Sequence, residues 1–153
     1  MDNLRRHWKS YLWQTACATS AVLVVLLVLD LQQAVIISSI GATTFIVFMK
    51  PSNPFATPRS IVGGYFVGAL VGTAFALLPH RTSWAASLVY ALAVGSALLL
   101  MAVTDTEHPP AAGTALSVAM AGGAWWAAVC ASLTSAVLLA LFHHLLRPYL
   151  KDL

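Results

Sequence analysis

The stretch PPAAGTALSVAMAGGAWWAAVCASLTSAVLLALFHHLL, residues 109–146, decides how many times this chain crosses a membrane. It carries no formal charge and is far longer than the roughly 20 apolar residues that one spanning helix needs. Gly122-Gly123 is a natural break, because glycine weakens a helix. Trp125 and Trp126 follow directly, and tryptophan concentrates at membrane–water interfaces. We therefore predict a short helix over residues 109–121 and a full span over residues 124–146.

The composition of the whole chain agrees with a location in lipid. Of the 153 residues, 59% are hydrophobic and only 8% are charged, whereas soluble domains carry about 25% charged residues. This excludes a soluble enzyme and a disordered chain, and it argues against a nucleic-acid partner despite the net charge of +3. We expect a single transmembrane domain over residues 1–153, with the lipid bilayer as its main partner.

Four further apolar stretches precede the one quoted above. They cover residues 10–29, 31–49, 60–79 and 83–104, and each has about the length of one membrane crossing. Together with residues 109–121 and 124–146 they make six segments, of which the second and the fifth are short. The predicted fold class is therefore an all-α membrane protein, a small bundle of about six helical segments.

The basic residues predict the orientation of these segments. Cytoplasmic loops of membrane proteins carry an excess of Lys and Arg. If both termini are cytoplasmic, the far side holds Arg81 alone, and the cytoplasmic side holds Arg5, Arg6, Lys9, Lys50, Arg59, Arg147 and Lys151. We therefore predict a multi-pass protein of the inner (plasma) membrane with both termini in the cytoplasm. The first span is expected to stay uncleaved, because it is long and lacks a small-x-small cleavage site.

The two halves of the chain, residues 10–79 and 83–146, share one pattern. Each runs from a long span to a short segment rich in small residues, SSIGATT at 38–44 and AAGTA at 111–115, and back to a long span. Three crossings per half mean that the second half starts from the opposite side, which predicts a 3+3 inverted-topology repeat. Matching interrupted segments point to the binding site of a transporter. The alternative is a chance coincidence of two small-residue segments.

Glycines and cysteines have structural interpretations. Gly64, Gly68 and Gly72 are four residues apart, so they line one helix face and allow close approach of a neighbouring helix. We expect this face to pack within the bundle, with an interface between subunits as the alternative. Cys17 and Cys130 lie far apart in apolar stretches and are expected to be free, buried thiols.

Polar residues concentrate in TDTEHPP, residues 104–110, just before the short fifth segment. Proline suits the first turn of a helix, and Thr106 or Glu107 could cap that turn. Free amides of residues 111–113 would then form an anion site at the positive end of the helix dipole. The segment 38–44 would add hydroxyl groups and an exposed backbone around Gly41. These two short helices are predicted to hold an anion at their N-terminal ends.

Three motifs resemble those of the HPP family of small integral membrane proteins. DTEHPPAAGTA at 105–115 looks like the family signature, and SIGAT at 39–43 is similar to its upstream S-x-G-A-[ST] motif. The proline-rich loop at 51–59, which leads into Gly63-Gly64, completes the resemblance. The resemblance implies four transmembrane helices, fewer than the six segments above. It also implies nitrite transport, to which chloroplast and cyanobacterial members are linked, although most bacterial members have no assigned substrate.

Each candidate residue has a functional and a structural interpretation. His108 could bind an anion when protonated or relay protons with Asp105 and Glu107, which could also act in gating; otherwise it caps a helix and bonds to a carboxylate. A metal site built from these three lacks a further histidine or cysteine, so no metal or cofactor is expected. Arg59 could raise the local anion concentration. The candidate substrate-binding residues are Ser38, Ser39, Gly41, Ala42, Thr43, Arg59, His108, Pro109, Pro110, Ala111, Ala112, Gly113 and Thr114.

These features predict a transporter or channel for a small inorganic anion, with nitrite as the implied candidate, acting as a homo-oligomer. The alternative is a membrane scaffold or a subunit of a larger membrane complex that transports nothing. An intramembrane enzyme is disfavoured, because the sequence shows no Ser/His or Asp/Asp pair at a catalytic spacing.

Overall fold

The structure, a computed structural model, describes residues 9–10, 13–14, 16–17, 34–79 and 82–153, and this part of the chain is helical without strands. Its main helices are α2 (Ala34–Met49), α3 (Pro58–Ala76), α4 (Ser83–Val103), α5 (Ala111–Met120) and α6 (Trp125–Leu146). Three short 3-10 helices, η1 (Pro54–Ala56), η2 (Gly122–Ala124) and η3 (Arg147–Tyr149), connect or extend them. The all-α class is thus confirmed for the described residues.

Three helical stretches are long and apolar enough to cross a membrane: α3, α4 and the stretch Gly122–Tyr149, which contains α6. The helices α2 and α5 are shorter, as the sequence predicted. The first expected segment, residues 10–29, lies largely outside the described residues, as does Arg81. The six-segment count and the inverted repeat therefore stay predictions.

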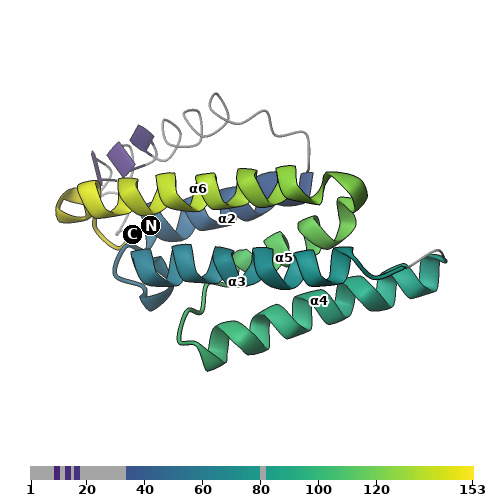
Figure 1. The fold of residues 1–153 in the computed structure, drawn as a ribbon. Coiled ribbons are helices and arrows are strands. Elements are labelled where there is room, and N and C mark those ends of the chain that lie inside the picture. The colour runs from purple at the N-terminus through teal and green to yellow at the C-terminus, as the bar shows by residue number, and fades with distance from the viewer. Residues whose placement is uncertain (1–8, 11–12, 15, 18–33, 80–81) are drawn as a thin grey trace.

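The helix α5 lies at the centre of the bundle (Figure 1) and contacts all four of the other main helices, α2, α3, α4 and α6. The helix α2 packs against α6, and α3 packs against α4. The core between them is largely aliphatic, with one buried tyrosine; its larger members include Ile36, Ile40, Phe48, Ile61, Tyr65, Met101 and Leu139. A ten-residue helix surrounded in this way is positioned from every side.

Local sequence explains where the helices begin and end. The hydroxyl of Thr57 accepts a hydrogen bond from the amide of Ser60 at 3.1 Å, and Pro58 occupies the first position of α3, where no amide bond is lost. The break predicted at Gly122-Gly123 is present: Gly122 has a φ of +54°, which glycine adopts without strain. The chain reverses there and enters α6 at Trp125.

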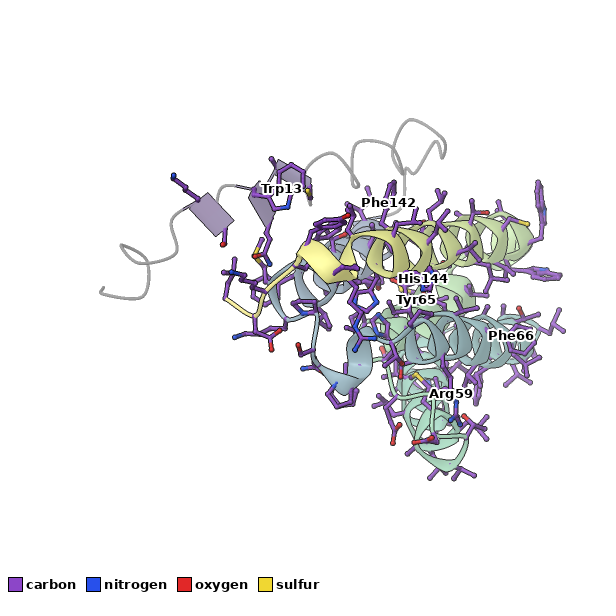
Figure 2. All side chains as sticks on the ribbon, turned by 90° about the vertical axis from the view of Figure 1, so that its left-hand side faces the viewer. Trp13, Arg59, Tyr65, Phe66, Phe142 and His144 are labelled. Atoms are coloured by element: carbon purple, nitrogen blue, oxygen red, sulfur yellow. The ribbon has the colours of Figure 1, made fainter. Side chains whose placement is uncertain are left out.

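The outer faces of the helices carry large apolar side chains, as expected of a bundle surrounded by lipid. Figure 2 shows the contrast on α3, where Tyr65 points into the bundle and its neighbour Phe66 points outward. The expectation of buried thiols is wrong for Cys130, which is exposed, and Cys17 is only partly buried. Cys130 lies on the outer side of α6, where a weakly polar thiol is compatible with lipid.

Candidate functional site

The loop between α2 and α3 and the loop between α4 and α5 meet at one end of the bundle and enclose His108. This histidine lies between α4 and α5 and has no exposed surface. Its Nε2 is 2.8 Å from the hydroxyl of Thr43 on α2, and its Nδ1 is 2.8 Å from the carbonyl oxygen of Phe55 in η1. The Thr43 hydroxyl is also 2.8 Å from the hydroxyl of Tyr65 on α3. We call His108, Thr43, Tyr65 and the Phe55 carbonyl the inner cluster.

The chemistry of the partners fixes the direction of every hydrogen bond in the inner cluster. A carbonyl oxygen only accepts, so Nδ1 of His108 donates to Phe55. In the neutral imidazole, Nε2 then accepts from the Thr43 hydroxyl. Thr43 in turn accepts from the Tyr65 hydroxyl. Both imidazole nitrogens are therefore satisfied when the ring is uncharged.

Burial also favours the uncharged form of His108. The histidine lies in the loop between two helices, and desolvation lowers its pKa to about 4, opposed in part by the hydrogen bond to Phe55. The interpretation of His108 as a protonated anion ligand or proton relay therefore does not fit its surroundings. The expected carboxylate partner is also absent among the described contacts of His108, because the ring faces the bundle and bonds to Thr43 and Phe55. At physiological pH it is neutral.

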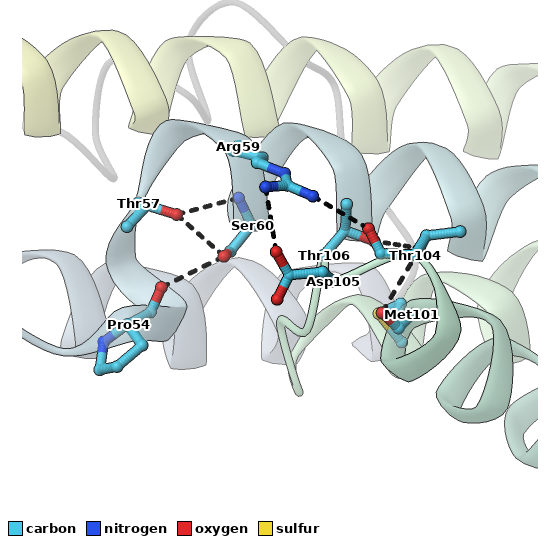
Figure 3. A network of polar contacts seen from close by, with 8 residues as sticks. All are labelled: Pro54, Thr57, Arg59, Ser60, Met101, Thr104, Asp105 and Thr106. Carbon is cyan, nitrogen blue, oxygen red and sulfur yellow. Dashed lines mark hydrogen bonds and ion pairs between the residues drawn. The ribbon is translucent and has the colours of Figure 1, made fainter.

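The outer side of the same loops carries charge. The Arg59 guanidinium lies 3.0 Å from a carboxylate oxygen of Asp105, with the two side chains 66% and 77% exposed. Arg59 also donates to the carbonyl oxygen of Thr104 at 3.2 Å (Figure 3). Asp105 has a φ of +54°, a left-handed conformation that aspartate tolerates better than most residues. We call this contact the outer ion pair.

A surface pocket of about 390 Å³ adjoins the outer ion pair. Its lining consists of Pro54, Phe55, Thr57, Arg59, Ser60, Asp105 and Glu107. Phe55 belongs both to this lining and, through its carbonyl, to the inner cluster. We call this cavity the outer pocket; Phe55 links it to His108.

The start of α5 differs from the prediction. The amides of Ala111, Ala112 and Gly113 were expected to be free, but they donate to the carbonyl oxygens three residues earlier, at 2.8, 3.1 and 3.0 Å. Pro109 and Pro110 have no N–H to offer. No side-chain hydrogen bond caps this helix, so the expected cap by Thr106 or Glu107 is wrong. The tight turn at His108–Pro110 has used the backbone donors that the anion site required.

The segment 38–44 is also not a helix start. It lies in the middle of α2, where Ser39 and Thr44 donate to the carbonyl oxygens four residues earlier. Ser39 and Thr43 face the interior, and the Ser39 hydroxyl lies against Gly113 of α5. Ser38, Gly41 and Ala42 are on the exposed side of α2. The two short helices therefore meet side by side, through Ser39 and Gly113.

The glycine face of α3 lies against α5 and the loop before it. A Cβ built on Gly68 would be 2.5 Å from the Ala111 carbonyl oxygen, and one on Gly72 would be 2.7 Å from the Ala115 carbonyl oxygen. A Cβ on Gly64 would be 2.8 Å from the Cβ of His108. Larger side chains at these positions would collide with the backbone of α5 or displace His108. The face thus packs within the bundle.

The three residues expected to act together, His108, Asp105 and Glu107, do not face the same side of their loop. His108 points inward, while Asp105 and Glu107 border the outer pocket. Within the part of the chain that the structure describes, no group of three or more His, Cys, Asp or Glu side chains could hold a metal ion. Arg59 and Asp105 do come together, as an ion pair.

Sequence reasoning missed Tyr65 and the Phe55 carbonyl, and it assigned His143 to the membrane interface rather than to a buried position. A tyrosine within an apolar span is itself a signal, because polar groups at membrane depth need partners. His143 on α6 is buried and bonds to the Pro51 carbonyl oxygen at 3.2 Å, so both buried histidines hold the loop between α2 and α3. The carbonyl partners leave no trace in a sequence.

A bundle of apolar helices around buried polar groups is an integral membrane protein. The family model described as "HPP, transmembrane region" matches residues 3–150. The chain therefore belongs to the HPP transmembrane region family, which confirms the resemblance seen in its motifs.

Two transmembrane proteins of Dictyostelium discoideum are similar to this chain. One is 34% identical over 113 residues, covering 71% of this chain and 40% of its own length. The other is 33% identical over 91 residues, covering 60% of this chain and 29% of its own length. The chain thus spans less than half the length of these relatives. No solved structure matches it.

Proposed function

We propose that this protein transports a small inorganic anion across its membrane, with nitrite as the first substrate to test. Nitrite comes from the family resemblance alone, since the two relatives are described only as transmembrane proteins. The bundle geometry supports transport of a small solute in general.

The observation that carries the proposal is the number of polar side chains buried between apolar helices. Polar groups inside a membrane bundle are costly and typically mark a pathway for solutes. Hydroxyl groups can donate hydrogen bonds to an anion without placing a permanent charge in the low-dielectric interior. Buried hydroxyl-bearing residues lie on the three helices α2, α5 and α6. Of these, Thr114 and Ser132 have hydroxyl groups without a hydrogen-bond partner.

The outer pocket would serve as the entrance. The exposed Arg59 lines it, and a cation at the mouth of a low-dielectric path raises the local concentration of anions. The carboxylates of Asp105 and Glu107 border the same pocket and repel anions. They counteract the attraction by Arg59, which suits a gating role. Inside the bundle, the anion would be held by side-chain hydroxyls, because the first amides of α5 are already bonded.

Transport fits the inner cluster better than catalysis does. A general base must present a free lone pair to its substrate, whereas both nitrogens of His108 are occupied by Thr43 and Phe55. In this proposal His108 is a positioning residue that holds two loops at the entrance.

The topology predicted from the sequence remains part of the proposal. In the predicted inverted repeat, α3 corresponds to α6 and α2 corresponds to α5. The two helices of each pair contact each other. One end of the bundle carries basic residues after α2, in the first turn of α3, and in and after η3: Lys50, Arg59, Arg147 and Lys151. The amide of Leu153 donates to the Met49 carbonyl oxygen at the same end. We assign this end to the cytoplasmic side of the inner membrane. A homo-oligomer would shield the polar path from lipid.

Uptake into vesicles tests the proposal. Purified protein in liposomes is expected to raise the initial rate of nitrite uptake above that of empty liposomes. Nitrate, formate and chloride, assayed in the same way, define the selectivity. Uptake equal to that of empty liposomes for all four anions would contradict transport and favour a scaffold role.

Arg59→Gln, with Arg147→Gln as its matched control, tests the entrance. Both arginines are exposed, but only Arg59 lines the outer pocket. Removal of Arg59 is expected to lower uptake about two- to fivefold at low anion concentration and low salt, with little effect at saturation. Arg147→Gln should leave uptake unchanged. Equal effects of the two variants would contradict a specific role for the pocket.

A further inference from the structure

Several hydroxyl groups at these helices are satisfied by their own helix. Ser39, Thr44, Thr73, Ser87, Thr104 and Ser135 each donate to the carbonyl oxygen four residues earlier, at 2.7 to 3.1 Å. This local bond is the usual way to satisfy a hydroxyl in an apolar helix. It leaves such a side chain without a free donor.

Thr114 on α5 and Ser132 on α6 lack such a bond. Among the described residues they are the hydroxyl-bearing side chains with a buried, unpartnered polar atom, beside one atom each of Gln14 and His143. Both side chains have no exposed surface, and neither hydroxyl has a hydrogen-bond partner. A buried hydroxyl without a partner is unfavourable, and native proteins rarely retain one without a reason such as a bound ligand or water. The two hydroxyls lie on helices that contact each other, so one ligand could explain both.

The chain path places the two hydroxyls at a similar depth. Thr114 precedes the end of α5 at Met120, and Ser132 follows the start of α6 at Trp125, by similar numbers of residues. At 1.5 Å per residue, each lies about 10 Å along its helix from the turn at 121–124. The chain enters that turn along α5 and leaves it along α6, and the two helices contact each other, so the two residues lie at similar distances from the turn on neighbouring helices.

The surroundings indicate what a ligand here would be. Thr114 lies in the first turn of α5, at the positive end of the helix dipole, which favours an anion over a cation. Gly68 of α3 is adjacent, since a Cβ at that position would be 3.4 Å from the Cβ of Thr114. The close approach of α3 and α5 favours a ligand of only a few atoms.

We infer that Thr114 and Ser132 form an inner subsite for a small monovalent anion, in which their two hydroxyls donate to the bound ion. This inference rests on the proposed transport function and names the inner contacts of the transported anion. It adds Ser132, which the sequence motifs did not indicate, to Thr114.

Direct binding tests the subsite independently of transport. The full chain in detergent is titrated with sodium nitrite, sodium formate or sodium chloride, and thermal unfolding is recorded, because a ligand that binds the folded state raises the unfolding temperature. At least one of these anions should raise the unfolding temperature of the wild type at constant ionic strength. Thr114→Val and Ser132→Ala should each weaken the apparent affinity about tenfold, the effect of losing one good hydrogen bond.

The stability without added anion separates a binding role from a structural one. Replacing an unpaired buried hydroxyl by an apolar group should leave the unfolding temperature equal or higher. The matched control is Ser135→Ala, on the same helix as Ser132, whose hydroxyl bonds to Ala131 at 2.7 Å. This control should lower the unfolding temperature slightly and keep the response to the anion.

Several outcomes would overturn the subsite. One is a wild type whose unfolding temperature responds to none of the three anions. Another is an unchanged response in both Thr114→Val and Ser132→Ala. A third is a lowered stability of these variants with full anion binding, which would assign the hydroxyls to a resident water or to each other. If vesicle uptake fails while the binding pattern holds, the transport proposal falls and the subsite stands.

Discussion

Asp105 and His108 are three residues apart in one loop, yet they face opposite sides of it. Asp105 forms the outer ion pair with Arg59, charged and mostly exposed. His108 belongs to the inner cluster, uncharged and without exposed surface. The two contacts are of similar length, 3.0 and 2.8 Å, but water screens the first and is excluded from the second. Burial, rather than charge, therefore decides which contact holds the loop.

The largest effect should come from His108→Ala. This change leaves the Phe55 carbonyl and the Thr43 hydroxyl without their partner and opens a cavity beside Tyr65. We expect a loss of about 3 kcal/mol or more in the free energy of unfolding. Denaturant titration in detergent micelles, followed by circular dichroism, measures it.

Tyr65→Phe tests the same cluster with a milder change. It removes only the hydroxyl that donates to Thr43 and should cost about 1 kcal/mol. The exposed Tyr149 supplies the control, since Tyr149→Phe should have no effect. If His108→Ala were as stable as the wild type, the distinction between the inner and outer contacts would fail.

A further loss of stability should come from acid, which acts on the inner cluster. The pKa of His108 is lowered to about 4 by burial, against about 6.5 in an unfolded chain. The unfolded chain therefore takes up the proton first, so this contribution is complete above pH 6.5 and is lost as the pH falls towards 4. The loss is on the order of 3 kcal/mol.

The difference in stability between the wild type and His108→Gln, measured from pH 7 to pH 4, isolates this contribution. A difference that does not change over this range would contradict a buried, neutral histidine. Transport should likewise show no inflection from His108 between pH 6.5 and 8, because the group stays neutral there.

The smallest effect should come from Asp105→Asn, which removes the charge from the outer ion pair. Asparagine accepts the positive φ of this position, so the backbone is not strained. The free energy of unfolding should change by about 0.5 kcal/mol or less. At low salt, nitrite uptake at low concentration should rise slightly, because Arg59 is no longer opposed, and about 0.5 M salt should abolish the rise. A large loss of stability would show that the outer contact is as important as the inner one.

The sequence predicted the helices better than it predicted the site. The expected segments 31–49, 60–79, 83–104, 109–121 and 124–146 correspond to α2, α3, α4, α5 and α6, with ends shifted by a few residues. Hydropathy and the Gly122 break carry this information, because lipid requires long apolar helices with satisfied backbones. The sequence also identified His108 and the glycine face of α3.

The bonding within the site could not be read in the same way. Phe55 takes part through its carbonyl, a group that every residue has, and Tyr65 meets Thr43 only after two helices pack. The proline pair correctly predicted a helix entry, but whether the next amides stay free depends on the tightness of the turn. Ser132 and Ser135 look alike in sequence, and only the fold shows which hydroxyl is bonded.

The proline pair at the start of α5 has a consequence for how substrate preference could change during evolution. The turn keeps the field of a helix end but withholds its N–H groups, so attraction there depends on ionic charge and radius. Every residue except proline has the same backbone donor, whereas hydroxyls such as that of Thr114 can be removed by one codon change. For the proposed anion path, a new ionic preference would therefore need few mutational steps and no change of the backbone.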